Sequence, residues 1–155
     1  MDLNQIMDND AIVLNVTATS KKQALKQVAG ILATKSGLNE RDIFDALVER
    51  EKLGSTALGG GVAIPHGKSE RAQSIHCVVV RLAEAIEFEA ADDEPVDIIV
   101  SILAPEQAST DHLKILAKIS KVLRDKANTE AIRTAETAAD LLATFISANG
   151  QSNAA

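Results

Sequence analysis

Two long apolar runs constrain the fold of this chain more than any other feature. Residues 75–82 and 96–103 are nearly continuous in apolar character and rich in valine and isoleucine. A strand that faces water on one side alternates apolar and polar residues, whereas a strand covered on both sides does not. The two runs therefore predict central strands of a sheet that is covered on both faces.

Segments with helical periodicity lie on either side of these runs. Ser20 and Gln23 fit a capping box for a helix that Gly37 closes, and Asn39 can cap a second helix. The other predicted elements are a strand at 12–16, extended backbone at 62–64, a helix from Ser109 or Thr110 to about Arg124, a short helix at 130–134 and a last helix from Thr137 to Gly150.

The helix that ends near Arg124 carries two apolar stripes, which predicts that it packs on more than one side. One stripe contains Leu113, Leu116 and Ala117, and the other contains Ile115, Ile119 and Val122.

The domain organisation follows from the order of these elements. A loop is predicted at 54–61. An exposed hairpin or loop is predicted at 84–94, where six acidic residues lie. Interleaved strands and helices without a linker or repeat predict one α/β domain over residues 1–150. Its expected architecture is a sandwich, a mixed parallel and antiparallel sheet flanked by α-helices on both faces. Residues 151–155 are predicted to form a disordered tail.

Composition excludes several classes of protein. A net charge of −6 and the absence of Trp and Tyr argue against nucleic-acid binding, which relies on cationic patches and stacked aromatics. The single cysteine, Cys77, cannot form an internal disulfide. The start of the chain lacks the pattern of a signal peptide, and the longest apolar run is too short for membrane insertion, so a cytoplasmic protein is expected. No phosphate-binding glycine motif or metal-ligand spacing is present, which predicts neither cofactor nor metal.

The stretch from Gly59 to Lys68 holds the leading candidate for chemistry, His66. Three glycines precede a short apolar strand, and His66 stands between Pro65 and Gly67. Glycine permits close approach of another group, and proline fixes the backbone. This pattern predicts an imidazole at the mouth of a loop with little bulk around it, where it can act as a nucleophile. The alternative is a histidine that only bonds a turn.

Four further polar residues could belong to a site or have ordinary structural roles. His112 lies in the first turn of a predicted helix, where the helix dipole favours an anion, although an ordinary surface histidine is the alternative. Arg50 continues an apolar helix face, and it either extends to solvent or meets phosphate at the rim of a site. His76 is interpreted as structural, and Asp111 as a helix cap.

Three blocks of the sequence resemble the mannitol/fructose-type IIA domains of the bacterial phosphotransferase system. They are Glu49–Leu53 with Gly61–Gly67, Pro95–Val100 and Asp111–Leu116, and the resemblance covers roughly residues 3–148. Within that family the chain is most similar to the nitrogen-regulatory members.

This resemblance implies a phosphotransferase component that carries phosphate between proteins. His66 would be phosphorylated through Nε2, with His112 stabilising the phosphoryl group and Arg50 contacting it or the partner. Gly61, Pro65 and Gly67 would shape the loop and supply backbone donors. The implied donor is an HPr-like phosphocarrier, and the implied regulated partners include potassium transporters, sensor kinases and stress-response enzymes.

Two other functions stay open from the sequence. The first is a sugar-specific IIA subunit that passes phosphate to a IIB transport component for fructose or mannitol. The second is a binding module in which His66 is structural.

Overall fold

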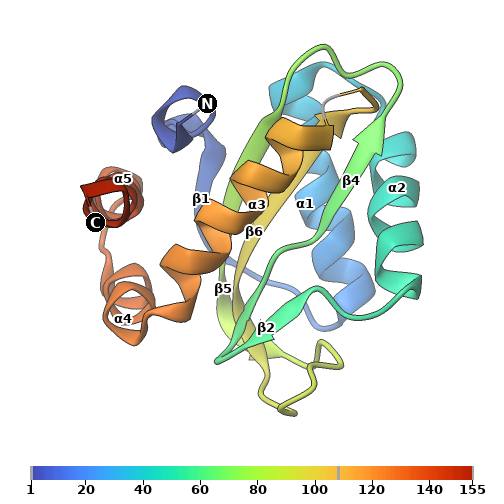
Figure 1. The fold of residues 1–155 in the computed structure, drawn as a ribbon. Coiled ribbons are helices and arrows are strands. Elements are labelled where there is room, and N and C mark those ends of the chain that lie inside the picture. The colour runs from blue at the N-terminus through green and yellow to red at the C-terminus, as the bar shows by residue number, and fades with distance from the viewer. Residues whose placement is uncertain (1, 108, 155) are drawn as a thin grey trace.

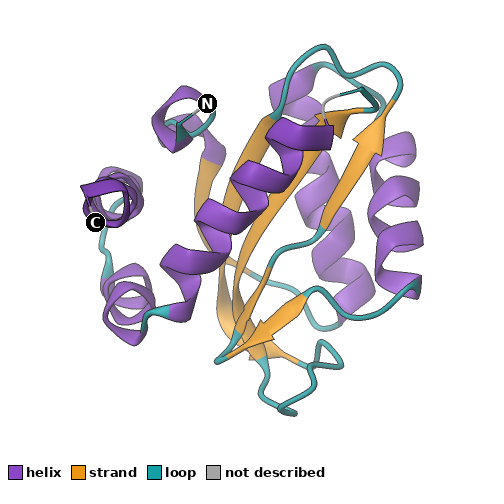
Figure 2. Ribbon diagram, viewed as in Figure 1, coloured by secondary structure: helices purple, strands orange, loops and turns teal. Residues whose placement is uncertain are grey.

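The computed structural model describes residues 2–107 and 109–154, with the backbone alone for residues 109 and 149–154. Figure 1 shows the course of the chain, and Figure 2 shows how its helices surround the strands. The strands are β1 (Ile12–Val16), β2 (Ala57–Gly59), β3 (Val62–Ala63), β4 (His66–Ser69), β5 (His76–Ile86) and β6 (Val96–Pro105). The helices are the short 3-10 helices η1 (Leu3–Gln5) and η2 (Asn9–Ala11), and the α-helices α1 (Lys21–Ser36), α2 (Glu40–Lys52), α3 (Ser109–Arg124), α4 (Lys126–Thr134) and α5 (Ala138–Ala154).

The strands form one mixed sheet in the order β1-β5-β6-β3-β2, and β4 also pairs with β6. The two long strands, β5 and β6, are antiparallel to each other at the centre, while β1 is parallel to β5. Strands β3 and β4 both run parallel to β6 and follow one another along it. Strand β3 pairs with Ile98 and Ile99, and the first residue of β4, His66, pairs with Ile102. The predicted mixed sheet is confirmed.

Each face of the sheet has its own apolar core. One core includes Ile98, Val100 and Ile102 of β6 and packs against α3, α4 and α5. The other includes Ile99 and Leu103 of the same strand and packs against α1 and α2. Alternate residues of β6 thus enter opposite cores, which explains why its sequence is apolar throughout. Figure 2 shows the helices on both sides of the sheet, as predicted.

Several predicted boundaries are wrong. The predicted loop at 54–61 contains β2, which pairs with β3 to form a short hairpin. The hairpin or loop predicted from Glu84 does connect two antiparallel strands, but it begins later, because β5 continues to Ile86, which pairs with Val96. That loop is also not wholly exposed, since Phe88 is fully buried between its acidic neighbours. These segments lack long apolar runs, and pairing within the sheet decides their conformation.

The C-terminal helices also begin or end differently from the prediction. Helix α4 begins at Lys126 rather than near Glu130, because the side chain of Asp125 caps it by accepting a hydrogen bond from the amide of Ala127. Helix α5 continues to Ala154, although Gly150 was predicted to end it. A glycine inside a helix costs about 1 kcal/mol relative to alanine but keeps its backbone hydrogen bonds, so it need not end the helix. The single domain over 1–150 and the tail over 151–155 stay predictions, and residue 155 lies outside the described residues.

Candidate functional site

His66 is held by the break between β3 and β4. Only residues 64 and 65 separate the two strands, and the carbonyl of Pro65 accepts hydrogen bonds from Ser101 Oγ at 2.8 Å and from the amide of Ile102 at 3.1 Å. These bonds tie the proline to the central strand β6. His66 is therefore the first residue of a strand, not a residue at the mouth of a loop, and its backbone position is fixed by the sheet.

One ring nitrogen of His66 is engaged and the other is available. Nδ1 lies 2.8 Å from the carbonyl oxygen of Ile64, and because a carbonyl only accepts, Nδ1 carries the proton. Nε2 then keeps its lone pair. Burial lowers the pKa of His66 below its usual 6.5; Arg50 lowers it further, whereas the Ile64 bond and the Glu51 carboxylate raise it. The ring is consequently neutral at pH 7, the form in which a histidine acts as a nucleophile.

His112 lies against His66 and comes from α3, which covers the face of the sheet opposite to α2. It belongs to the first turn of α3, only 4% of it is exposed, and the two ring centroids are 5.5 Å apart with the planes at 76°. Its Nε2 is buried and has no hydrogen-bond partner among the described residues. Burial, followed by the nearby His66 and Lys68, lowers the pKa of His112 to about 4. The interpretation of His112 as a surface histidine is therefore wrong.

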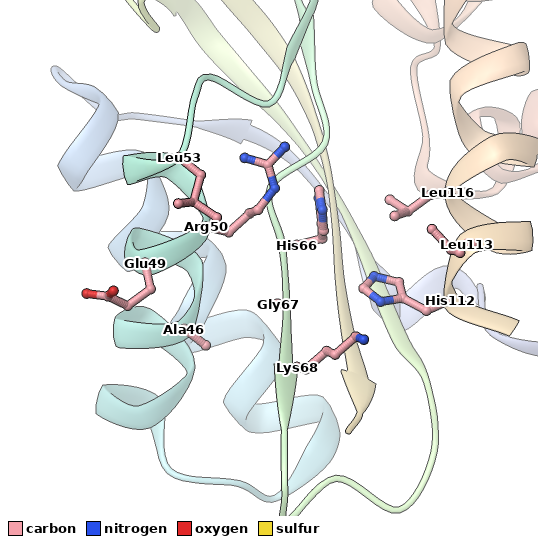
Figure 3. A pocket seen from close by; sticks show the side chains of 10 residues that line it. All are labelled: Ala46, Glu49, Arg50, Leu53, His66, Gly67, Lys68, His112, Leu113 and Leu116. Atoms are coloured by element: carbon pink, nitrogen blue, oxygen red, sulfur yellow. The ribbon is translucent and has the colours of Figure 1, made fainter. Parts of the chain in front are cut away.

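A pocket of about 550 Å³ connects the two histidines with α2. Figure 3 shows Arg50 on α2 beside His66, with His112, Leu113 and Leu116 on the facing helix. Its lining residues are Ala46, Glu49, Arg50, Leu53, His66, Gly67, Lys68, His112, Leu113 and Leu116.

Arg50 lies in this pocket rather than pointing away from it. One of its guanidinium nitrogens, Nη1, donates to the carbonyl of Gly54 at 2.9 Å, so the residue also holds the loop that follows α2. The guanidinium has further donors, which can meet phosphate oxygens in a planar arrangement. Its position in the pocket agrees with the interpretation that Arg50 meets phosphate at the rim of a site.

Glycine is favoured beside His66 because α2 and β4 approach closely there. A Cβ atom on Gly67 would lie 3.1 Å from the Cβ of Ala46, tighter than an ordinary contact. Gly61 plays a different part. It is absent from the residues that line the pocket, it has a φ of +83°, and a Cβ there would lie 2.6 Å from Arg133 Nη2. The structure thus brings together His66, Gly67, His112 and Arg50, with Pro65 behind them, but not Gly61.

The sequence did not indicate several residues of the pocket, among them Lys68, Leu53 and Leu113. Lys68 follows His66 by two positions on β4, and the alternation of a strand could have placed both side chains on one face. Leu53 is 84% exposed and Leu113 is 66% exposed, and both lie at the rim. The apolar stripe of α3 that contains Leu113 and Leu116 therefore borders the pocket, and Leu116 also packs against the core on that face of the sheet.

The described residues include no group of three or more His, Cys, Asp or Glu side chains that could hold a metal ion. Within the same part of the chain, no helix has the length and apolar character needed to cross a membrane.

The arrangement places a nucleophile beside hydrogen-bond donors that can bind an anion. A neutral imidazole offers a lone pair, while a second imidazole and two cationic side chains lie where they can meet an anion. The apolar rim leaves the pocket open to a large partner.

Comparison with known proteins gives a consistent family. The sequence profile described as "Phosphoenolpyruvate-dependent sugar phosphotransferase system, EIIA 2" matches residues 5–148. A nitrogen regulatory protein of Bradyrhizobium diazoefficiens is 44% identical over 138 residues, which cover 89% of this chain and 90% of that protein. A fructose-specific EIIA component of the phosphotransferase system in Haloferax volcanii is 32% identical over 149 residues, 94% of this chain and 97% of that protein. The crystal structure of the nitrogen regulatory protein IIA-Ntr from Neisseria meningitidis superposes with a TM-score of 0.89 at 35% identity, covering 92% of this chain and 98% of that one.

Proposed function

Because the chain belongs to the type 2 EIIA family of the phosphoenolpyruvate-dependent sugar phosphotransferase system, we propose that it is a regulatory phosphocarrier that receives phosphate on His66. The observation that carries the proposal is the state of the His66 ring. Nδ1 is bonded to the carbonyl of Ile64, and Nε2 keeps its lone pair within a pocket that also holds the buried His112. The donor is an HPr-like carrier of the nitrogen-related relay, and the protein works in the cytoplasm without membrane insertion or nucleic acid.

The transfer step needs no cofactor. The lone pair of His66 Nε2 attacks the phosphorus of a phosphohistidine on the donor, in line with the bond that breaks. A new N–P bond forms on His66 while the old one breaks, and its electron pair returns to the donor imidazole. Charge on the phosphoryl oxygens is stabilised by Arg50 and by His112, whose buried Nε2 has no hydrogen-bond partner in the described part of the chain. Such catalysis consists of positioning and electrostatic stabilisation.

The apolar rim is where the proposed donor docks. Leu53, directly after α2, and Leu113 on α3 stand on opposite sides of the pocket, and both expose most of their surface (Figure 3). A protein surface that covers them would exclude water from the transfer and bury apolar area. The donor's phosphohistidine would then enter between the two leucines.

The regulatory output follows from charge. A phosphoryl group adds between one and two negative charges at pH 7, on a surface whose only carboxylate among the described lining residues is Glu49. Proteins that bind this face would distinguish the two states. Potassium transporters, sensor kinases and stress-response enzymes are the classes of regulated partner that we propose.

A sugar-specific IIA subunit is the alternative function. It is favoured by the 32% identity to the fructose-specific EIIA component, which has a similar length. That subunit would use the same His66 chemistry and would pass phosphate to a IIB transport component. The higher identity to the nitrogen regulatory protein supports the regulatory proposal instead.

Phosphoryl transfer between purified proteins separates these functions. The chain is incubated with phosphoenolpyruvate and either the nitrogen-branch or the sugar-branch pair of enzyme I and HPr-like carrier, and intact mass is followed. We expect one phosphoryl group, added rapidly with the nitrogen pair and absent in His66→Ala. Preference for the sugar pair would favour the transport subunit, and no transfer from either pair would leave a binding module.

A further inference from the structure

We infer that Glu51 is a positioning residue for His66, which it acts on through Thr56 and the backbone of Ile64. The catalytic importance of this role rests on the proposed function, because it matters only if His66 receives phosphate. The effect of Glu51 on the His66 ring can be measured without any phosphoryl transfer.

Glu51 is a buried carboxylate with a full set of partners. It is next to Arg50 at the end of α2, yet its side chain is only 6% exposed and does not line the pocket that contains both histidines. One oxygen lies 2.8 Å from Lys21 Nζ, and the carboxylate accepts from the amide of Thr56 at 3.1 Å and from the hydroxyl of the same threonine. A buried charge is retained only when it is paired and hydrogen-bonded, so these contacts are specific.

The bonds continue from Thr56 to the catalytic ring. The carbonyl of Thr56 accepts from the amide of Ile64 at 3.1 Å, and the carbonyl of Ile64 is 2.8 Å from Nδ1 of His66. Ile64 lies between β3 and β4 and is outside both strands, so the bond to Thr56 extends the β2–β3 hairpin and fixes its backbone. Glu51 thereby fixes the carbonyl that decides which ring nitrogen of His66 carries the proton.

The contacts from Glu51 through Thr56 to Ile64 control the tautomer of the His66 ring. If the Ile64 carbonyl turned away, the proton could move to Nε2, and the nitrogen that faces the pocket would no longer have a lone pair. Glu51 also raises the pKa of His66 through its charge. Glu51→Gln separates the two effects, because glutamine removes the charge but keeps an acceptor oxygen for both donors of Thr56.

Nitrogen NMR of the His66 ring tests the inference directly. In the unaltered protein at neutral pH we expect a single tautomer with the proton on Nδ1. Glu51→Ala should give a mixture in which at least about a third of the ring carries the proton on Nε2, and phosphoryl transfer should slow at least about tenfold, as expected for a displaced catalytic group. Glu51→Gln should keep the original tautomer. Asp45→Asn, which removes an exposed ion pair with Arg41 on the same helix, is the matched control and should change neither.

Each outcome decides the inference. A pure Nδ1–H tautomer in folded Glu51→Ala overturns it, even if transfer slows, because the effect would then be structural. If Glu51→Ala does not fold, Thr56→Val replaces it: this variant loses the hydroxyl but keeps the backbone, and an unchanged tautomer there also overturns the inference. The two proposals can also fail separately. If Glu51→Ala shows a mixed tautomer but no carrier transfers phosphate to the unaltered protein, the proposed function is refuted and the positioning role is not.

Discussion

Phosphorylation of His66 should raise the pKa of His112 from about 4 to between about 6 and 8. The starting value reflects burial first, and then the nearby His66 and Lys68. A phosphorylated ring that keeps its Nδ1 proton carries one net negative charge, and a ring that has lost it carries two. With the 5.5 Å separation of the two ring centroids as the charge separation, and an effective dielectric constant of about 20, each charge stabilises protonated His112 by about 3 kcal/mol. That energy corresponds to about two pKa units per charge.

The consequence is uptake of a proton when the protein is phosphorylated near neutral pH. Protonated His112 would then be a charged donor to the phosphoryl group, and a change in pH would shift the equilibrium of the carrier with its donor. Nitrogen NMR of the His112 ring, titrated with and without phosphate on His66, measures the shift. Hydrolysis of the phosphoryl group should restore the original titration, which serves as the control. A His112 pKa that remains below about 5 in the phosphorylated protein would refute the reasoning.

Three further predictions concern stability and docking. Between pH 6.5 and about 4, the unfolded chain binds a proton at His112 more readily than the native protein does. Protonation of His112 should therefore lower the free energy of unfolding by about 3 kcal/mol as pH falls from 6.5 to about 4. Urea unfolding at both pH values should show this loss in the native sequence and not in His112→Gln. Arg81→Met should destabilise the protein by about 2 kcal/mol in the same assay. The two N–H groups of Arg81 Nη1 are shared among three carbonyls at the end of α4, including that of Ala135 at 2.6 Å. Leu113→Asp should leave the free energy of unfolding within about 0.5 kcal/mol, since Leu113 is 66% exposed, yet it should raise the KM for the donor; an unchanged KM would remove Leu113 from the docking surface.

The parts of the fold that sequence predicted are those with local causes. Strands β5 and β6 are recognisable because their residues are apolar whichever face they occupy. Helix starts were located by single side chains: Ser20 Oγ accepts from the amide of Gln23 at 3.1 Å, and Asn39 Oδ1 accepts from the amide of Asp42 at the same distance. Such caps act over three residues and need no tertiary context.

Strand β4 could not be predicted in the same way. The residues His66 to Ser69 have neither an apolar run nor alternation, and they are extended because β6 provides a free edge beyond Ile102. The same limit applies to the site. The motif around Pro65 identifies His66, but the buried position of His112 depends on how α3 packs across the sheet. The role inferred for Glu51 depends on a chain of contacts through Thr56 that no spacing in the sequence reveals.

The position of the phosphoryl group on the His66 ring tests the central claim most directly. The protein is phosphorylated by its carrier, and phosphorus and nitrogen NMR then identify the bonded nitrogen. Because Nδ1 is held by the carbonyl of Ile64 at 2.8 Å, we expect a single phosphohistidine bonded through Nε2 of His66. Phosphate on Nδ1, or on any other residue, would contradict it.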